Sequence, residues 1–456
     1  MRHNNFVLAL LAAAALTACG GSDNSAPAAP AKPKFASQVN FGDSLSDVGT
    51  YRVGTIAALG GGKFTVNGDN VVVNPTLTGK VWPELAAAAF GLSASCAAVT
   101  GLDGVAAQGF AVPITNNLTC TNYAMGGARV TNPVGPSNKA LGSPIGALTI
   151  PVVTQVATHL ARNGGKFSGS EIVFVMAGGN DALMLTGGLT AAATAEGGKV
   201  GGQTLIGNLS TYLTTGATNP TTAKAAVQTA MGTEAARTGS TSATIVGVGI
   251  QTAAMQPGNS AVGAVAVYGP LVARAQTEAT TAGTAAATAF GAANGPGLVP
   301  QMAQAGAELA LLIKSQIVAK GANYVVVNNL PDLAGTPNGK AQSASSQQLL
   351  TGMANGFNIA LRAGLDGLDA KVLYVDVNAA TAEWVANPAK YGISNATTPV
   401  CGPNALGTAS LVCNRNNLIA GNIGAYAFAD DVHPSPFGHT LISKQVLDAM
   451  AARGWF

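Results

Sequence analysis

Ser44 has the side chain of a nucleophile and lies in the string Gly42-Asp43-Ser44-Leu45, directly after the β-like run SQVNF. Gly42 lacks a Cβ atom and can take the tight turn that exposes the next residues at the carboxyl end of a strand. Open α/β sheets place their sites at that end. No serine of the chain lies in a GxSxG string, which excludes the nucleophile elbow of the α/β-hydrolases. Asp43 and Ser44 could also simply cap a helix.

A serine nucleophile needs a general base, which is most often histidine. The sequence has four histidines. His3 lies in the N-terminal apolar region, and His159 lies in a helical pattern where we expect it at the surface or at an interface. The other two, His433 and His439, lie in the string AFADDVHPSPFGH near the C-terminus. A base for Ser44 is therefore expected from this string.

His433 is the stronger candidate, because Asp430 precedes it by three residues. At that spacing the carboxylate can reach the imidazole Nδ1, fix the tautomer and stabilise the imidazolium. Asp431 is the alternative acid, and the three-residue spacing favours Asp430. Pro434 favours a loop here, and His439 is expected in the first turn of the closing helix. The spacing of these acids and histidines matches no usual ligand pattern, which argues against a metal site. A serine nucleophile with a histidine base requires no metal or organic cofactor.

Acyl transfer also needs hydrogen-bond donors for the developing oxyanion. Two glycine-containing strings at the ends of other β-like runs could supply them. In NYAMGGA, residues 122–128, glycine lets a backbone N–H approach the reacting oxygen. In GGND, residues 178–181, the side-chain amide of Asn180 could point into a cleft. Taken alone, each glycine pair is explained as well by an ordinary turn.

The rest of the chain alternates β-like runs with helical patterns, which is typical of a parallel sheet covered by helices on both faces. We therefore predict a three-layer α/β/α sandwich with a central parallel sheet, flavodoxin-like in architecture, over residues 37–456. The predicted strands are SQVNF, CTNYAM, EIVFVMA, YVVVNNL and KVLYVDV, and the predicted helices are VWPELAAAAFGL, VVTQVATHLAR, PQMAQAGAELALLIKSQIVAKG and the segments 343–366 and 440–453.

Residues 187–296 depart from this alternation. The segment is rich in Ala, Gly and Thr, contains seven charged residues, and shows helical windows but no clear strand–helix repeat. We interpret it as an insertion between EIVFVMA and the next core helix, either a lid over the site or a partly mobile surface lobe. A variable loop without a function is the alternative.

The N-terminal region predicts export. Arg2 precedes an apolar segment, residues 6–16, that is too short to span a bilayer. The string LTAC that follows resembles the lipobox of bacterial lipoproteins. This resemblance implies a signal peptide over residues 1–18 and a lipid anchor on Cys19, with the outer membrane of the cell envelope as the expected location. An ordinary secretory signal is the alternative. Residues 19–36, rich in Gly, Ser, Ala and Pro, are expected to form a flexible tether.

The four other cysteines form two sequence-local pairs, Cys96 with Cys120 and Cys401 with Cys413. Oxidising compartments favour disulfides, and loops of this length would each stabilise the fold by about 3 kcal/mol. Four cysteines allow three pairings, so the local pairing is a preference. A zinc site is the alternative, but no CxxC string or histidine–cysteine cluster supports it.

Charge excludes one class of partner. Only 9% of the residues are charged, the formal net charge is +3, and no basic run with interleaved aromatic residues occurs. Nucleic acid is therefore not expected as a partner. An ester substrate, and a membrane through the anchor on Cys19, are the expected partners.

Four of these strings, taken in order, resemble the four sequence blocks of the GDSL, or SGNH, hydrolase family. They are GDSL with Ser44, the glycine string of residues 122–128, GGND with Asn180, and DDVH with Asp430 and His433. The resemblance runs from about residue 38 to the last residue, apart from the insertion. Residues 327–331 (VNNLP) and 82–83 (WP) also resemble elements of the larger bacterial and plant-like members.

The resemblance implies a role for each of these residues. Ser44 would be the nucleophile, His433 the base and Asp430 its orienting acid. The oxyanion hole would consist of the backbone N–H groups of Ser44 and Gly127 and the side-chain amide of Asn180. We therefore expect a secreted or lipid-anchored serine esterase or lipase. The alternatives are an acyltransferase or carbohydrate esterase with the same triad, and a surface scaffold or adhesin on an inactive hydrolase fold.

Overall fold

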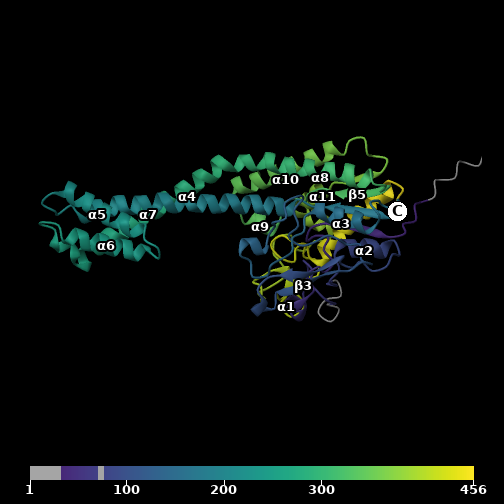
Figure 1. The fold of residues 1–456 in the computed structure, drawn as a ribbon, viewed down its shortest axis with the longest axis horizontal. Helices are drawn as coiled ribbons and strands as arrows, with labels where there is room; N and C mark the ends of the chain where they lie inside the picture. The colour runs from purple at the N-terminus through teal and green to yellow at the C-terminus, as the bar shows by residue number, and fades with distance from the viewer. Residues whose placement is uncertain (1–31, 70–76) are drawn as a thin grey trace, which may run out of the picture.

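The computed structural model describes residues 32–69 and 77–456; the predicted signal peptide and Cys19 lie outside the described residues. In this described part of the chain, the central sheet has four parallel strands in the order β1-β4-β5-β6. It forms the middle of the compact part of the molecule (Figure 1). The strands are β1 Gln38–Gly42, β4 Ile172–Met176, β5 Tyr324–Asn328 and β6 Val372–Val375.

The two faces of the sheet bury separate apolar cores, because alternate side chains of a strand point to opposite sides. Val173 and Val175 of β4 pack in the core formed with α3, α8 and α10. Ile172, Phe174 and Met176 pack in the core formed with α2, α11 and α12. The predicted three-layer α/β/α sandwich is confirmed. The covering helices are α2 Trp82–Ala89, α3 Val152–Arg162, α8 Leu298–Leu312, α10 Ala344–Gly364, α11 Val377–Ala386 and α12 Pro436–Ala452.

The closing helix α12 starts four residues before the predicted position. The Ser435 hydroxyl accepts the backbone N–H of Gly438 at 3.1 Å, and Pro436 occupies the first helical position. A capping serine followed by proline is a strong start signal for a helix. Only Pro434 and Ser435 separate His433 from this helix, so the start of the helix limits where His433 can lie.

The segment CTNYAM, predicted as a strand, does not form a regular strand of the sheet. Asn122 forms a single parallel bridge with Asn40 of β1. The N–H of Tyr123 donates to the carbonyl of Asn40 at 2.8 Å, and the N–H of Met125 donates to that of Gly42 at 3.1 Å. The ladder ends there because the N–H of Gly42, which would continue it, donates instead to the side-chain Oε1 atom of Gln155 at 2.9 Å. The segment nevertheless follows β1 and delivers the next residues to its carboxyl end.

The remaining short elements lie outside the central sheet. β2 Val99–Asp103 pairs antiparallel with β3 Ala111–Asn116, and two short helices are α1 Gly54–Ala58 and α9 Pro337–Lys340. No sequence pattern singled these elements out.

The predicted insertion is a helical arm that projects from the compact part of the molecule (Figure 1). α4 leaves the sheet at Gly179 and runs unbroken to Leu213, and α7 returns alongside it. α5 and α6 pack against the far half of this pair. The arm helices are α4 Gly179–Leu213, α5 Pro220–Ala235, α6 Ser242–Ala254 and α7 Val265–Asn294.

Small residues and a separate core stabilise the arm. Gly197 of α4 and Gly283 of α7 meet so closely that a Cβ atom on either would lie 2.7 Å from the carbonyl oxygen of the other. Farther along, Leu209, Val227 and Met231 are fully buried in an apolar cluster that is distinct from the cores of the sheet. The low charge and high Ala and Gly content of this segment therefore reflect close helix packing.

Both local disulfides predicted from the sequence are present, Cys96–Cys120 and Cys401–Cys413. Disulfides of this kind indicate an extracytoplasmic protein. Over residues 32–69 and 77–456, no helix has both the length and the apolar composition needed to cross a membrane. Phe35, which the sequence assigns to the tether, is buried against the rings of Phe90 and Tyr324.

Candidate active site

Ser44 lies two residues after the end of β1, at the carboxyl edge of the sheet. At Gly42, a Cβ atom would lie 2.2 Å from the carbonyl oxygen of Met176 at the end of β4. Only glycine fits between the two strand ends, so β1 can turn there without being pushed away from β4. The turn that follows leaves Ser44 7% exposed, on the floor of a cleft.

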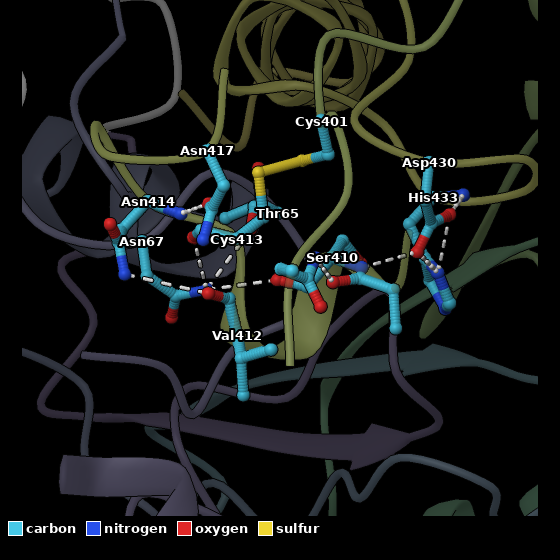
Figure 2. The surroundings of a disulfide bond; sticks show 12 residues. Thr65, Asn67, Cys401, Ser410, Val412, Cys413, Asn414, Asn417, Asp430 and His433 are labelled. Atoms are coloured by element: carbon cyan, nitrogen blue, oxygen red, sulfur yellow. Dashed lines mark hydrogen bonds and ion pairs between the residues drawn. A yellow bond between two sulfur atoms is a disulfide. The ribbon is translucent and has the colours of Figure 1, made fainter. Parts of the chain in front are cut away.

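His433 and Ser44 are 389 residues apart in the sequence, and the fold brings them into contact. The imidazole Nε2 lies 2.9 Å from the Ser44 Oγ atom. On the other side of the ring, Nδ1 lies 2.9 Å from both carboxylate oxygens of Asp430. Figure 2 shows this carboxylate directed at the imidazole. The arrangement gives histidine a hydroxyl to deprotonate and a carboxylate to hold its tautomer.

The loop between α11 and α12 holds this pair in place. The backbone N–H groups of Val432 and His433 donate to Asp430 Oδ1 at 3.0 and 2.7 Å. The N–H of Ala429 donates to the His433 carbonyl at 2.8 Å and closes the turn. The exposed neighbour Asp431 makes no such contact with the ring among the described residues. The three-residue spacing thus reflects a tight turn that bends Asp430 back towards the imidazole.

The charges of the pair support each other. Burial alone would raise the pKa of Asp430, but the charge of His433 and hydrogen bonds from His433 and Ser410 hold that pKa well below its usual range. Burial alone would lower the pKa of His433, yet the Asp430 carboxylate outweighs it and raises that pKa above the ordinary value. Asp430 is therefore a stable anion at neutral pH, ready to stabilise an imidazolium.

A second carboxyl group borders the cleft and was not singled out from the sequence. Asp43 is 3% exposed and lies among the residues that line the cleft beside Ser44. Its Oδ1 atom accepts the N–H of Leu45 at 3.1 Å. Burial raises the pKa of Asp43 to about 7, although the charge of His433 opposes that rise. An acid next to a nucleophile was visible in the sequence, but its burial was not.

The glycine string and the GGND string meet beside Ser44. Gly127 has a φ of +79°, which glycine adopts without strain. The Asn180 amide lies in the first turn of α4 and donates to the carbonyl of Ala128 at 2.8 Å. Because an amide carries two N–H donors, this bond orients the group and leaves a second donor. Ser44, Gly127, Asn180 and His433 all line one cavity.

An ion pair joins these two strings, and sequence reasoning missed it. Arg129 Nε lies 3.0 Å from Asp181 Oδ1, and the N–H of Val130 donates to Asp181 Oδ2 at 3.1 Å. Both side chains are largely buried. Burial raises the pKa of Asp181, and Arg129 opposes this rise. The acid that ends GGND thus fixes the glycine string against the start of α4.

Two cavities meet at the candidate triad, with volumes of about 120 and 200 Å³. The first is walled mainly by apolar side chains, among them Leu45, Leu330, Leu333, Trp384, Phe428 and Ile442. The second includes Tyr51, Phe64 and Leu411. Both share Ser44, Asn180, Leu183 and His433.

The arm contributes to the first cavity only through the first turns of α4. Ala182, Leu183 and Thr186 line this cavity, and no described residue from 187 to 296 does so. In this structure the arm therefore leaves the cleft uncovered, and its function as a lid stays a prediction.

The other two described histidines lie elsewhere. His159, expected at the surface or an interface, is instead 4% exposed and packs against Phe41 and Phe167. Burial lowers its pKa to about 4. The prediction failed because His159 lies on the inner face of α3, where an aromatic cluster covers the sheet.

His439 is in the first turn of α12, as expected. It is fully buried, and its Nδ1 atom accepts the backbone N–H of Trp82 at 3.3 Å. Burial lowers its pKa to about 3. In residues 32–69 and 77–456, no group of three or more His, Cys, Asp or Glu side chains is arranged to hold a metal ion.

Comparison with known proteins gives partial matches. No protein-family model matches the chain. It is 29% identical over 143 residues to the GDSL esterase/lipase APG of Arabidopsis thaliana, which covers 29% of this chain and 40% of that protein. A second GDSL esterase/lipase of this plant is 37% identical over 86 residues, covering 19% and 23%. An uncharacterised Pseudomonas putida protein from the trpE–trpG intergenic region is 31% identical over 158 residues, covering 33% and 25%.

The chain thus spans 40% or less of the length of these relatives. The matched segments are similar to parts of several GDSL esterase/lipases.

Proposed function

We propose that this protein is a carboxylic ester hydrolase that works through an acyl-enzyme. Ser44 is the nucleophile, His433 the general base and Asp430 the acid that orients the base. The observation that carries the proposal is the continuous contact from Ser44 Oγ to His433 Nε2 and from His433 Nδ1 to Asp430, each at 2.9 Å. The GDSL esterase/lipase relatives support the same class of reaction.

The reaction follows from these contacts. As the Ser44 Oγ atom attacks the ester carbonyl carbon, its proton passes to His433 Nε2, and Asp430 stabilises the imidazolium. The imidazolium then protonates the leaving alkoxide, and the C–O bond of the ester breaks to leave an acyl group on Ser44. A water molecule then loses a proton to His433 and attacks the acyl carbon. The bond from that carbon to Ser44 Oγ breaks, the imidazolium returns its proton to Oγ, and the carboxylic acid leaves.

Each tetrahedral intermediate carries a negative oxygen that needs hydrogen bonds. The backbone N–H groups of Ser44 and Gly127 and the amide of Asn180 are the proposed donors. Ala128 orients the amide by accepting one of its N–H groups at 2.8 Å. The Arg129–Asp181 ion pair at 3.0 Å holds the strand-end segment that contains Gly127 against the helix that contains Asn180.

The substrate class follows from the walls of the cavities. An apolar acyl or alkoxy group would bury its surface against side chains such as Leu330, Trp384 and Phe428. The experiment is turnover of p-nitrophenyl esters of increasing chain length, combined with a fluorophosphonate probe. Release of p-nitrophenol and a probe adduct mapped to Ser44 are expected. An inert protein that takes up no probe would contradict the proposal, and ester formation with added glycerol would redirect it to acyl transfer.

Replacing Asn180 by alanine should lower kcat by about 10²–10³ and change KM little, because the lost donor acts mainly on the transition state. Steady-state kinetics with a p-nitrophenyl ester measure this. Asn338→Ala is the matched control, since Asn338 also borders the first cavity but is not a proposed oxyanion donor. Equal losses in the two variants would exclude the oxyanion role.

We also propose that the protein is exported and anchored by a lipid on Cys19. The lipobox-like string LTAC and the two disulfides support export. The mass of the mature N-terminal peptide tests the anchor, because a modified Cys19 should be its first residue.

A further inference from the structure

The second disulfide closes a loop directly beside the candidate triad. Cys401 and Cys413 are 4% and 0% exposed, and their bond joins positions twelve residues apart. Figure 2 shows this bond, the turn that ends the loop, and the Asp430–His433 pair in one neighbourhood.

The contact is a hydrogen bond from the loop backbone to the triad carboxylate. The N–H of Ser410 donates to Asp430 Oδ2 at 2.9 Å. Asp430 Oδ1, by contrast, accepts the N–H groups of Val432 and His433, which belong to its own turn. The donor to Oδ2 therefore comes from a different segment. It holds the second oxygen and so limits rotation of the carboxylate about its Cβ–Cγ bond.

The Ser410 backbone is itself held at several points. Ser410 begins the 3₁₀ turn Ser410–Val412, immediately before Cys413. Asn67, which is 4% exposed, donates from Nδ2 to the carbonyls of Ser410 and Cys413 at 3.0 and 3.1 Å. Its backbone N–H also donates to the Cys413 carbonyl, at 2.7 Å. The Asn67 side chain is oriented in turn by the N–H of Lys63, which donates to its Oδ1 atom at 2.9 Å.

We infer that the backbone N–H of Ser410 is a positioning group for the Asp430 carboxylate, and that Asn67 and the Cys401–Cys413 disulfide hold it there. The inference rests on the proposed function, because it takes Asp430 as the acid of the triad. The Ser410 side chain has no part in this: its hydroxyl is buried and has no hydrogen-bond partner among the described residues.

Removing the donor has two consequences for the reaction. The carboxylate can rotate, so the imidazole spends less time aligned with Ser44, and kcat falls while substrate binding is unaffected. A hydrogen bond to a charged group contributes about 1.5–3 kcal/mol, which corresponds to about 10- to 100-fold in rate if the whole of it is lost in the transition state. The carboxylate also becomes more basic without its donor and stabilises the imidazolium more strongly, so the pKa of His433 rises.

The variant that tests this is Ser410→Pro, because proline has no N–H. The position suits proline: it is the first of a 3₁₀ turn, and Ala409 before it is extended with ψ at 133°. Ser410→Ala is the matched control, since it keeps the N–H and removes only the unpartnered hydroxyl. We expect Ser410→Pro to lower kcat about 10-fold or more, with KM unchanged and the acid limb of kcat/KM moved to higher pH. Ser410→Ala should match the wild type in all three.

Two double variants test the inference even if Ser410→Pro does not fold. Cys401→Ala with Cys413→Ala releases the loop, and Cys96→Ala with Cys120→Ala removes the other disulfide. Both are assayed well below their melting temperatures. The Cys401/Cys413 double variant should lower kcat at constant KM, and the Cys96/Cys120 double variant should lose stability only. Equal kcat values in the two double variants, or a wild-type kcat in a folded Ser410→Pro variant, would overturn the inference. If Ser44→Ala also retains turnover, the proposed function fails instead.

Discussion

Replacing Ser44 by alanine should reduce ester hydrolysis by about 10⁶-fold in kcat, the loss seen when a triad nucleophile is removed. Ser44 is the hydroxyl that His433 contacts, at 2.9 Å, so the change removes the group that this base would activate. The residual rate over water would come from the oxyanion donors and substrate binding. Initial rates with a p-nitrophenyl ester, together with loss of fluorophosphonate labelling, measure the effect.

The control for this variant is Ser137→Ala. Ser137 borders the second cavity and is exposed, and no hydrogen bond of its side chain is present in the described residues. Its rate should stay within a few-fold of the wild type. Both variants should keep the wild-type melting temperature, because neither change removes a packed apolar group. A Ser44→Ala protein that is folded and still hydrolyses the ester would show that another residue is the nucleophile.

Asp430→Asn should lower kcat by about 10⁴-fold, whereas Asp431→Asn should have little effect. Asparagine keeps the shape of the side chain but cannot stabilise an imidazolium, and its amide group favours the wrong tautomer of His433. The exposed Asp431 is the sequence neighbour and the closest available control. Steady-state kinetics of the two variants decide which carboxylate belongs to the triad, and the reverse order of effects would reassign the acid.

The pH dependence of kcat/KM tests the role of Asp430 independently. His433 accepts a proton only when it is neutral, so activity is lost as the pH falls through its pKa. Asp430 raises that pKa and burial lowers it. Without the carboxylate the burial effect remains, so the acid limb of kcat/KM should move to lower pH in Asp430→Asn. An unchanged limb would mean that another group controls the titration.

Much of the architecture could be predicted because its physical signals are local. A strand that is apolar at every position, such as IVFVM of residues 172–176, is buried on both faces, and that pattern indicates a parallel sheet between helices. The disulfides were also predictable, since each joins cysteines close in sequence. The Asp430–His433 contact was predictable for the same reason, because three residues span one tight turn.

The errors occurred where tertiary contacts determine the outcome. His159 lies on a helix whose inner face is decided by the sheet below it, so its burial against Phe41 could not be derived from its own segment. CTNYAM has the composition of a strand, but the side chain of Gln155, from a helix later in the chain, accepts the N–H of Gly42 that would extend its pairing with β1. The Arg129–Asp181 pair joins segments 52 residues apart, and only the fold reveals it.

The boundary of the insertion was obscured by composition. The residues after GGND are rich in glycine and alanine, so the amphipathic pattern that usually marks a helix is weak there. The helix was therefore expected to belong to a separate segment beginning at residue 187. α4 instead begins at Gly179 and includes Asn180 in its first turn.

The unbroken course of α4 insulates the proposed oxyanion donor from motion of the arm. A helix of 35 residues extends about 50 Å, and Asn180 is its second residue. The bonds from Asn180 to Ala128 and from Asp181 to Arg129, together with Leu185 and Leu189 packed against the core of the sheet, hold this end to the compact part of the molecule, so a pivot of the arm lies at or beyond it. A tilt of about 5° around that pivot displaces the far end by about 4 Å but the amide by only a few tenths of an ångström. A displacement of the arm of this size is therefore expected to leave the hydrogen-bond geometry beside Ser44 unchanged.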